Sequence, residues 1–239
     1  MAALAADLGV MRTQEAPDVT EEEWFEQAWA VREEDVYPRL FGPLSEDICV
    51  LTPDLFLKTF KQESFDPRWL HYGVFEAAPT DTRSSWLYVS SGLSNAWEDD
   101  HPESSGTSGL GMEFVLQTAQ REAWAIPRLA HVVAFPILLA SGRYPGRDLL
   151  DLHDRMPLRS SIAGEASEIT WLTVGPLDGF PSSFQLPTGS VDLLAVVGVT
   201  EQEAGYGRKH GGATLIELLR QETAYPVTDW RRSSLVGAA

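Results

Sequence analysis

Two runs of sequence decide the fold of this chain, Trp86-Leu-Tyr-Val-Ser-Ser-Gly-Leu-Ser94 and Ser108-Gly-Leu-Gly-Met-Glu-Phe-Val-Leu-Gln117. From Met112 to Gln117 apolar and polar side chains alternate, which is the period of a strand with one apolar face. Gly109 and Gly111 come just before this alternation, where we expect backbone angles that other residues rarely adopt. The two runs therefore predict strands of a mixed α/β domain.

The composition is that of a folded protein. The 239 residues are 44% hydrophobic and 10% aromatic, and they suffice for one large domain or two lobes. The lone cysteine, Cys49, excludes an internal disulfide, favours a reducing cytoplasm and is expected in the core. No apolar run approaches the roughly 18 residues of a membrane helix, and Met1 to Val10 lacks the basic start of a secretory signal. We therefore predict a cytoplasmic protein without a membrane span.

The charge balance constrains the partner. Thirty-five acidic and 18 basic residues give a formal charge of −17. Nucleic-acid binding depends on basic side chains that neutralise phosphates, so nucleic acid is not an expected partner. An acidic protein attracts basic partners, and its charge mainly raises their association rate. The alternative is that the acidity only keeps the protein soluble.

The N-terminal part predicts a leader followed by a helix. Residues 1–18 have no clear period and are predicted to be a mobile leader. Thr20-Glu-Glu-Glu23 matches a capping box, and apolar residues at helical spacing follow it. We expect this helix to end at Pro38 and the Phe41-Gly-Pro43 turn.

Further along the chain, strand and helix patterns alternate with loops. Residues 95–109 form an acidic loop rich in Ser and Gly. Residues 124–141 predict the strongest helix, with a kink or early end at Pro136. The other expected elements are a short strand over 48–51, an extended stretch over 69–75, strands over 169–174 and 191–199, and helices from Thr200 and over 213–221.

No catalytic or metal-binding motif is present. The five histidines occur singly, without zinc-ligand spacing, so we expect no metal and no cofactor. Gly106 to Gly111 lacks the serine-elbow pattern and leads into a strand, whereas the elbow leads into a helix. The glycine-rich stretch from Gly205 to Gly212 could hold an anion at a helix start, but a flexible loop is favoured.

The two opening runs resemble the suppressor of fused domain. Three later segments fit that family in the same order, namely Leu194 to Glu203, Thr214 to Arg220 and Val227 to Arg232. The resemblance covers residues 45–236. It implies a single domain over 19–239, with a central mixed, largely antiparallel sheet flanked by helices. It also implies a non-catalytic protein-binding module and not an enzyme.

The family offers two kinds of binding. Animal members carry a second domain and bind an extended peptide by adding it as a strand in the cleft between domains. Bacterial members resemble the first domain alone, and many are thought to be immunity proteins encoded beside toxins. Because the sequence ends just past Val236, we expect no second domain, and its 15 Arg against 3 Lys are typical of a bacterial protein. We therefore expect an immunity protein that neutralises a basic toxin domain. The alternatives are a regulatory protein that works by strand addition and an enzyme acting on a small molecule.

The resemblance also suggests partner-binding residues. Tyr88 lies on the strand near the family's peptide contact, and Asp99 and Asp100 occupy the acidic stretch after it. In the family an acidic side chain there pairs with a basic peptide residue. The alternative is that Tyr88 packs in the sheet and the two acids are solvated.

Four other polar residues are expected to be structural. Alternation places Glu113 on the face opposite Phe114, and a buried carboxylate needs a partner, for which Arg231 or Arg232 is the candidate. Asp229 is expected to cap its own turn. These residues would fasten the closing segment to the sheet.

Overall fold

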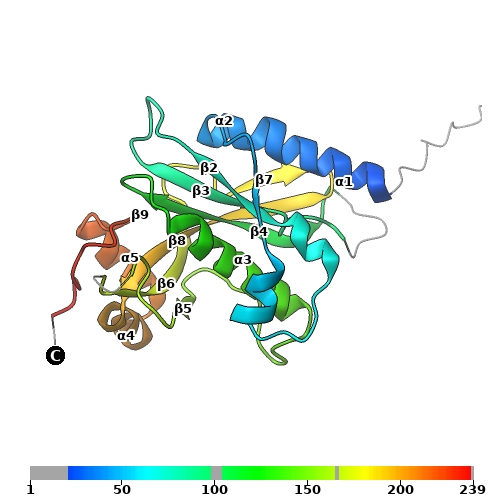
Figure 1. Cartoon of the computed structure of the whole chain (residues 1–239). Helices are drawn as coiled ribbons and strands as arrows, with labels where there is room; N and C mark the ends of the chain where they lie inside the picture. The colour runs from blue at the N-terminus through cyan, green and yellow to red at the C-terminus, as the bar shows by residue number, and fades with distance from the viewer. Residues whose placement is uncertain (1–20, 98–103, 165–166, 238–239) are drawn as a thin grey trace, which may run out of the picture.

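A nine-stranded sheet forms the centre of the computed structural model, which describes residues 21–97, 104–164 and 167–237 (Figure 1). The predicted leader, residues 1–18, lies outside the described residues. The strands are β1 (Cys49–Val50), β2 (Gly73–Ala77), β3 (Trp86–Ser91), β4 (Thr107–Thr118), β5 (Arg155–Pro157), β6 (Ile169–Pro176), β7 (Ser183–Leu186), β8 (Gly189–Thr200) and β9 (Val227–Thr228).

The sheet is mixed and largely antiparallel, as expected. Its order is β1-β2-β3-β4-β8-β6-β5, with β7 beside β8 and β9 beside β4. Among the described strands, only the pairings of β4 with β8 and with β9 are parallel. Tyr88 on β3 lies opposite Leu116 on β4, and Glu113 on β4 lies opposite Leu193 on β8. The runs Trp86–Ser94 and Ser108–Gln117 therefore contribute adjacent strands at the centre of the sheet.

Helices cover both faces of the sheet. They are α1 (Glu21–Ala30), α2 (Tyr37–Phe41), α3 (Ala125–Ala140), α4 (Glu201–His210) and α5 (Gly212–Gln221), with a π-helical segment Val31–Val36, a second one Leu55–Thr59 and a 3-10 helix Pro67–His71. On one face Phe114 and Leu116 pack with Leu129 and Val133 of α3. On the other face, Val115 belongs to a core that includes residues of α2 and α5. Figure 1 shows α1 and α2 on the side of the sheet opposite α3.

The N-terminal helix runs through Pro38 and ends one turn later. α1, the π-helical segment and α2 are continuous, and Pro38 lies in the first turn of α2. Because proline lacks an N–H, it is best tolerated where the regular hydrogen-bond ladder is already interrupted, as it is after a π-helical segment. The helix ends at Gly42, whose φ of 82° is open mainly to glycine. The expected capping residue Thr20 lies outside the described residues.

α3 also continues through its internal proline. Pro136 is buried in the helix, with Ile137 and Leu138 buried beside it. Since a proline inside a helix costs about 3 kcal/mol, the apolar packing of the last turn outweighs the lost hydrogen bond. No described helix is long and apolar enough to cross a bilayer.

Several other expectations are corrected. Residues Pro67–His71 form a 3-10 helix, so only the second part of the expected extended stretch is a strand. Gly205 and Gly207 lie within helix α4, not in a flexible loop, because the capping box of Thr200 and Glu203 starts the helix before them. Cys49 is exposed and not in the core, since β1 has only two residues, both exposed.

Candidate protein-binding site

A tight turn from Gly92 to Trp97 leaves β3 and forms one wall of a pocket. Gly92 has a φ of 120°, and a Cβ there would lie 2.9 Å from Cα of Tyr72. Gly109 has a φ of 56°, and its Cβ would lie 2.4 Å from the carbonyl oxygen of Asn95. Gly111 has a φ of 73°, so both glycines before the β4 alternation adopt the expected backbone angles that other residues rarely adopt. Glycine is therefore required for the turn to pack this closely against its neighbours.

The buried carboxylate of Glu113 holds this turn. Its Oε1 accepts hydrogen bonds from the backbone N–H of Gly92 at 3.0 Å and of Ser94 at 2.9 Å, and from the Ser94 hydroxyl at 2.7 Å. Its Oε2 accepts one from the hydroxyl of Ser90. Glu113 is fully buried, and these donors replace the water it would otherwise bind. Glu113 thus ties the end of β3 to β4.

Arg32 links the N-terminal helix to the same turn. Its Nη1 donates to Ser94 Oγ at 3.0 Å and to Asn95 Oδ1 at 2.8 Å, and its Nη2 donates to Glu33 Oε1 at 3.0 Å. Glu33 Oε1 also accepts a hydrogen bond from the hydroxyl of Ser91. Arg32 is only 1% exposed, so the whole network is shielded from water. Buried polar networks restrict the movement of their surroundings, although Nε of Arg32 has no hydrogen-bond partner among the described residues.

The expected pairing of Glu113 with Arg231 or Arg232 is wrong. Glu113 lies on the sheet face that the N-terminal helix covers, and Ser94 connects it to Arg32. The closing segment enters at the opposite end of β4, where β9 pairs with Gln117 and Thr118. The two arginines therefore cannot serve Glu113.

The pocket beside the turn has a volume of about 660 Å³. Its lining comes from the 3-10 helix Pro67–His71, the turn, the start of β4 and the end of α3. Three aromatic residues line it, namely Trp69, Tyr72 and Trp97. Burial raises the pKa of Tyr72, so its hydroxyl stays protonated. The pocket combines aromatic walls with a few polar groups, as ligand and peptide sites usually do.

The aromatic walls are fixed from behind. The ring of Trp97 stacks on Phe25 of α1 with ring centroids 4.5 Å apart, and the ring centroid of His71 lies 5.8 Å from that of Trp97. Trp69 packs against Phe56 at 4.9 Å. The rings therefore have partners that hold their orientation before any ligand arrives.

Tyr88 is not part of the lining of this pocket. Its side chain is fully buried in the core, and its hydroxyl accepts a hydrogen bond from the backbone N–H of Glu122 at 3.0 Å. Tyr88 therefore packs in the sheet, which corrects the expectation of a direct partner contact. Asp99 and Asp100 follow Trp97 in the sequence but lie outside the described residues.

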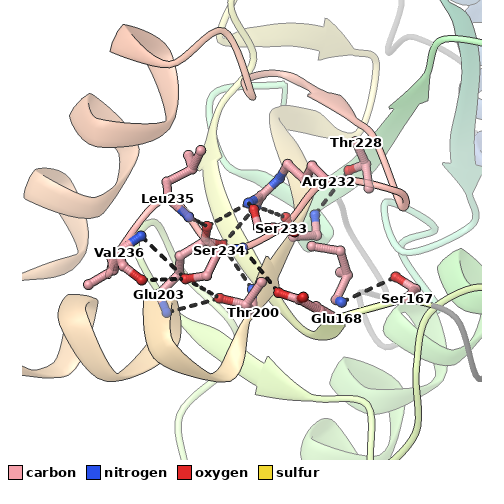
Figure 2. Close-up of polar contacts among 12 residues, drawn as sticks. Ser167, Glu168, Thr200, Glu203, Thr228, Arg232, Ser233, Ser234, Leu235 and Val236 are labelled. Atoms are coloured by element: carbon pink, nitrogen blue, oxygen red, sulfur yellow. Dashed lines mark hydrogen bonds and ion pairs between the residues drawn. The ribbon is translucent and has the colours of Figure 1, made fainter. Parts of the chain in front are cut away.

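The closing segment has a polar site of its own (Figure 2). Arg232 donates from Nη2 to Glu203 Oε2 at 2.7 Å, and Glu203 also accepts from the backbone N–H groups of Thr200 at 2.8 Å and Leu235 at 2.9 Å. Burial alone would raise the pKa of Glu203, but Arg232 and the two amides outweigh it and lower this pKa. The segment is therefore fastened to the start of α4.

The other predicted polar residues lie nearer the surface. Asp229 Oδ1 accepts from the backbone N–H of Arg231 at 2.9 Å, which confirms the expected cap of that turn. Arg231 is 59% exposed, and its Nη1 lies 3.8 Å from Glu122 Oε1. Asp229 and Arg231 thus organise the segment locally, while Arg232 anchors it.

Sequence reasoning missed Arg32 and Glu203. The pattern Thr200-x-x-Glu203 could have identified Glu203 as a capping-box residue. Nothing in the sequence around Arg32 marks it as buried. Among the described residues, no three His, Cys, Asp or Glu side chains gather as metal ligands would.

The chain is similar to proteins of one family. The family model described as suppressor of fused protein (SUFU) matches residues 68–233. No curated protein matches the chain.

Solved structures share the fold at low sequence identity. Drosophila Suppressor of Fused is 23% identical, with a TM-score of 0.54 over 69% of this chain and 42% of that one. A chain of the Sufu–Fu complex is 22% identical, with a TM-score of 0.54 over 69% of this chain and 76% of that one. A SUFU homolog from Neisseria gonorrhoeae is 16% identical, with a TM-score of 0.57 over 91% of this chain and 100% of that one.

The extent of these matches differs. The chain spans less than half the length of the Drosophila protein, but it covers the whole of the Neisseria homolog. The nine-stranded sheet and its flanking helices account for the shared fold. Because the family model extends over more than half of its residues, this chain belongs to the suppressor of fused family.

Proposed function

We propose that this chain is a non-catalytic protein-binding domain that holds a segment of its partner in the pocket beside the Gly92–Trp97 turn. The observation that carries the proposal is the aromatic lining of this 660 Å³ pocket, which the Glu113 and Arg32 network supports from behind. Preorganised aromatic walls favour binding because little side-chain freedom is lost when a ligand enters. A relative in this family, Sufu, is known in a complex with Fu.

The partner is a basic toxin domain, and this chain acts as its immunity protein. The formal charge of −17 supports a basic partner, since opposite charge accelerates encounter. The acidic residues Asp99 and Asp100 follow directly on the pocket wall in the sequence and are proposed to meet basic groups of the toxin. The protein works within the cytoplasm.

Strand addition is the alternative mode, and the sheet gives it less support. The strands of the described sheet that pair with a single neighbour, β1, β5, β7 and β9, have only two to four residues each. Short edge strands offer few backbone groups for an added strand. An enzyme would need convergent catalytic groups, for which the pocket lining gives no pattern.

A blocking substitution tests the proposed function. Ala140 is exposed and lines the pocket at the end of α3, so Ala140→Trp should fill the opening without disturbing the core. The matched control is Ala213→Trp, at an exposed position in α5 outside the lining.

The partner in this test is the product of the gene beside the one that encodes this chain, co-expressed with it. We expect wild type and Ala213→Trp to co-purify with that product and to protect cells from it, while Ala140→Trp does neither. Equal binding and protection by the Ala140→Trp protein would refute the pocket as the binding site.

A further inference from the structure

A second pocket lies at the other end of β4, well away from the Gly92–Trp97 turn. It has a volume of about 540 Å³ and lies between α2, the turn Thr80 to Arg83 and the turn Asp178 to Pro181. β4 connects the two sites, because Gly109 lines the first pocket and Gln117 lines the second. The second pocket has the size of a small-molecule site.

Gln117 presents an unused hydrogen-bond donor in this pocket. The residue is 4% exposed, and its Oε1 accepts a hydrogen bond from Ser85 Oγ at 2.6 Å. Its Nε2 is buried and has no partner among the described residues. A buried amide nitrogen without an acceptor is rare, because its hydrogen bonds to water are lost on folding and not replaced, which destabilises the protein. A ligand oxygen would satisfy it.

Arg83 adds positive charge at the same place. Its Nη2 donates to the carbonyl oxygens of Phe41 and Ala78, both at 2.8 Å, and its Nη1 donates to that of Ser85. These bonds leave two of the five guanidinium N–H groups for another acceptor. The only acceptors that Arg83 reaches within the described chain are neutral carbonyls. No carboxylate among the described residues therefore balances its charge.

The one acid in the lining is already neutralised. Asp178 accepts hydrogen bonds from Nε and Nη2 of Arg220 at 2.8 and 2.7 Å. An anion that enters the pocket therefore meets the charge of Arg83 without strong repulsion from Asp178.

The rest of the lining is mixed: it is partly apolar, and it also includes Thr80, Thr82 and Arg39, which pairs with Asp35. The rings of Phe41 and Phe180 lie with their centroids 5.3 Å apart, and Pro38 and Pro181 also line the pocket. These rings and prolines favour a ligand that carries an apolar group as well as an oxygen acceptor.

From these features we propose that the second pocket binds a carboxylate attached to an apolar group, with Gln117 Nε2 and the Arg83 guanidinium as its donors. A planar carboxylate has two oxygens, one for each donor, and guanidinium–carboxylate contacts are strong and directional. The carboxylate comes either from a small organic acid or from the C-terminus of a peptide that ends in an apolar residue. This inference is independent of the proposed toxin binding.

Nuclear magnetic resonance titration of the full chain tests the proposal. The probes are phenylacetate, its neutral analogue phenylacetamide, inorganic phosphate and a hexapeptide that ends in Phe with a free carboxylate. The readout is the shift of the Gln117 side-chain amide signals, with thermal stabilisation as a second measure because a ligand of the folded state raises the melting temperature. We expect saturable binding of phenylacetate or of the peptide, with at least tenfold weaker binding of phenylacetamide and phosphate.

Variants separate the site from non-specific effects. Gln117→Met removes the donor and should weaken phenylacetate about tenfold, the usual effect of one lost hydrogen bond to a charged group. Thr82→Trp, at an exposed lining position, should abolish binding, whereas Ser64→Trp, exposed and outside the lining, should not.

Each outcome decides the matter. Binding of phenylacetate alone assigns a small acid, and binding of the peptide alone assigns a chain terminus. Equal binding of phenylacetamide or phosphate, binding that survives Thr82→Trp, or no shift of the Gln117 signals with any probe would overturn the proposal.

Discussion

The guanidinium of Arg232 lies against the carboxylate of Glu203, with Nη2 2.7 Å from Oε2, and the two side chains are 10% and 0% exposed. The same carboxylate accepts the backbone N–H groups of Thr200 and Leu235. One buried acid therefore caps α4 and fixes the closing segment at the same time. Such a pair is costly to break from one side, because the remaining charge keeps its burial and loses its partner.

Arg232→Leu should lower the free energy of unfolding by about 3–5 kcal/mol, the usual cost of leaving one member of a buried pair uncompensated. Urea denaturation followed by circular dichroism measures this change. The control is Arg231→Leu, because Arg231 is largely exposed, and an exposed pair contributes about 1 kcal/mol or less. Equal losses in the two variants would argue against the buried pair as the anchor.

Glu113→Ala should also destabilise the protein, through the turn it holds. The substitution leaves the backbone N–H groups of Gly92 and Ser94 without an acceptor, at roughly 1–3 kcal/mol for each. Chemical denaturation gives the loss, and amide chemical shifts of the two residues report the turn. Glu217→Ala, at an exposed position, serves as the control. A Glu113→Ala protein that is fully stable but no longer binds its partner would instead place Glu113 in the interface.

Stability should fall as the pH decreases from about 6.5 to about 4, because of His131. Burial, together with Arg128 and Arg159, lowers the pKa of His131 to about 4 from an ordinary 6.5. Within this window the unfolded chain binds a proton that the folded chain does not, so acid favours unfolding by about 1.4 kcal/mol for each pH unit.

Denaturation curves of wild type and His131→Gln at several pH values measure this contribution. The variant should lose the slope between pH 6.5 and 4. Both proteins should lose further stability below about pH 4.5, because of Glu203. Its pKa is lower in the folded chain than in the unfolded chain, so the unfolded chain takes up a proton first as the pH falls through this range. Identical slopes for the two proteins would exclude His131 as the source.

Charge reversal of Asp99 and Asp100 to Lys should slow association with the proposed toxin more than it speeds dissociation. Steering acts over the Debye length, which falls from tens of ångströms at low salt to a few at about 0.5 M, so the wild-type on-rate should fall over this range. Surface plasmon resonance measures both rates. Reversal of the exposed Asp81 and Glu222 changes the net charge equally and is the control. An on-rate that depends neither on salt nor on the Asp99 and Asp100 reversal would contradict electrostatic steering.

Local patterns predicted the sheet well, because successive side chains of a strand point to opposite faces and the sequence shows which of them are apolar. Phe114 and Val115 face opposite cores, as their alternation implies. The first helix ends at the expected Phe41-Gly-Pro43 turn but not at Pro38, which follows a π-helical segment. The expected early end at Pro136 is wrong, because the packing of buried residues, which a local pattern does not contain, keeps α3 continuous.

The polar site was predicted only in part. Alternation placed Glu113 on its face, but its partners come from a turn about 20 residues earlier and, through Ser94, from Arg32 more than 60 residues before that turn. Nothing in the sequence around Glu113 or Arg32 specifies that the two side chains are linked through Ser94. Long-range polar partners are therefore the part of this site that required the structure.

The parallel pairing of β4 with β8 has a consequence for how the chain folds. Glu113 and Leu193, opposite each other in that pairing, are 80 residues apart, whereas β2 and β3 are neighbours in the sequence. Contacts between distant residues form slowly, because a long loop must close before they contribute. We therefore expect the β2–β3 hairpin to form early during synthesis and the centre of the sheet to close late. Until β8 arrives, one edge of β4 is open, which makes this intermediate the stage most exposed to aggregation and to chaperone binding.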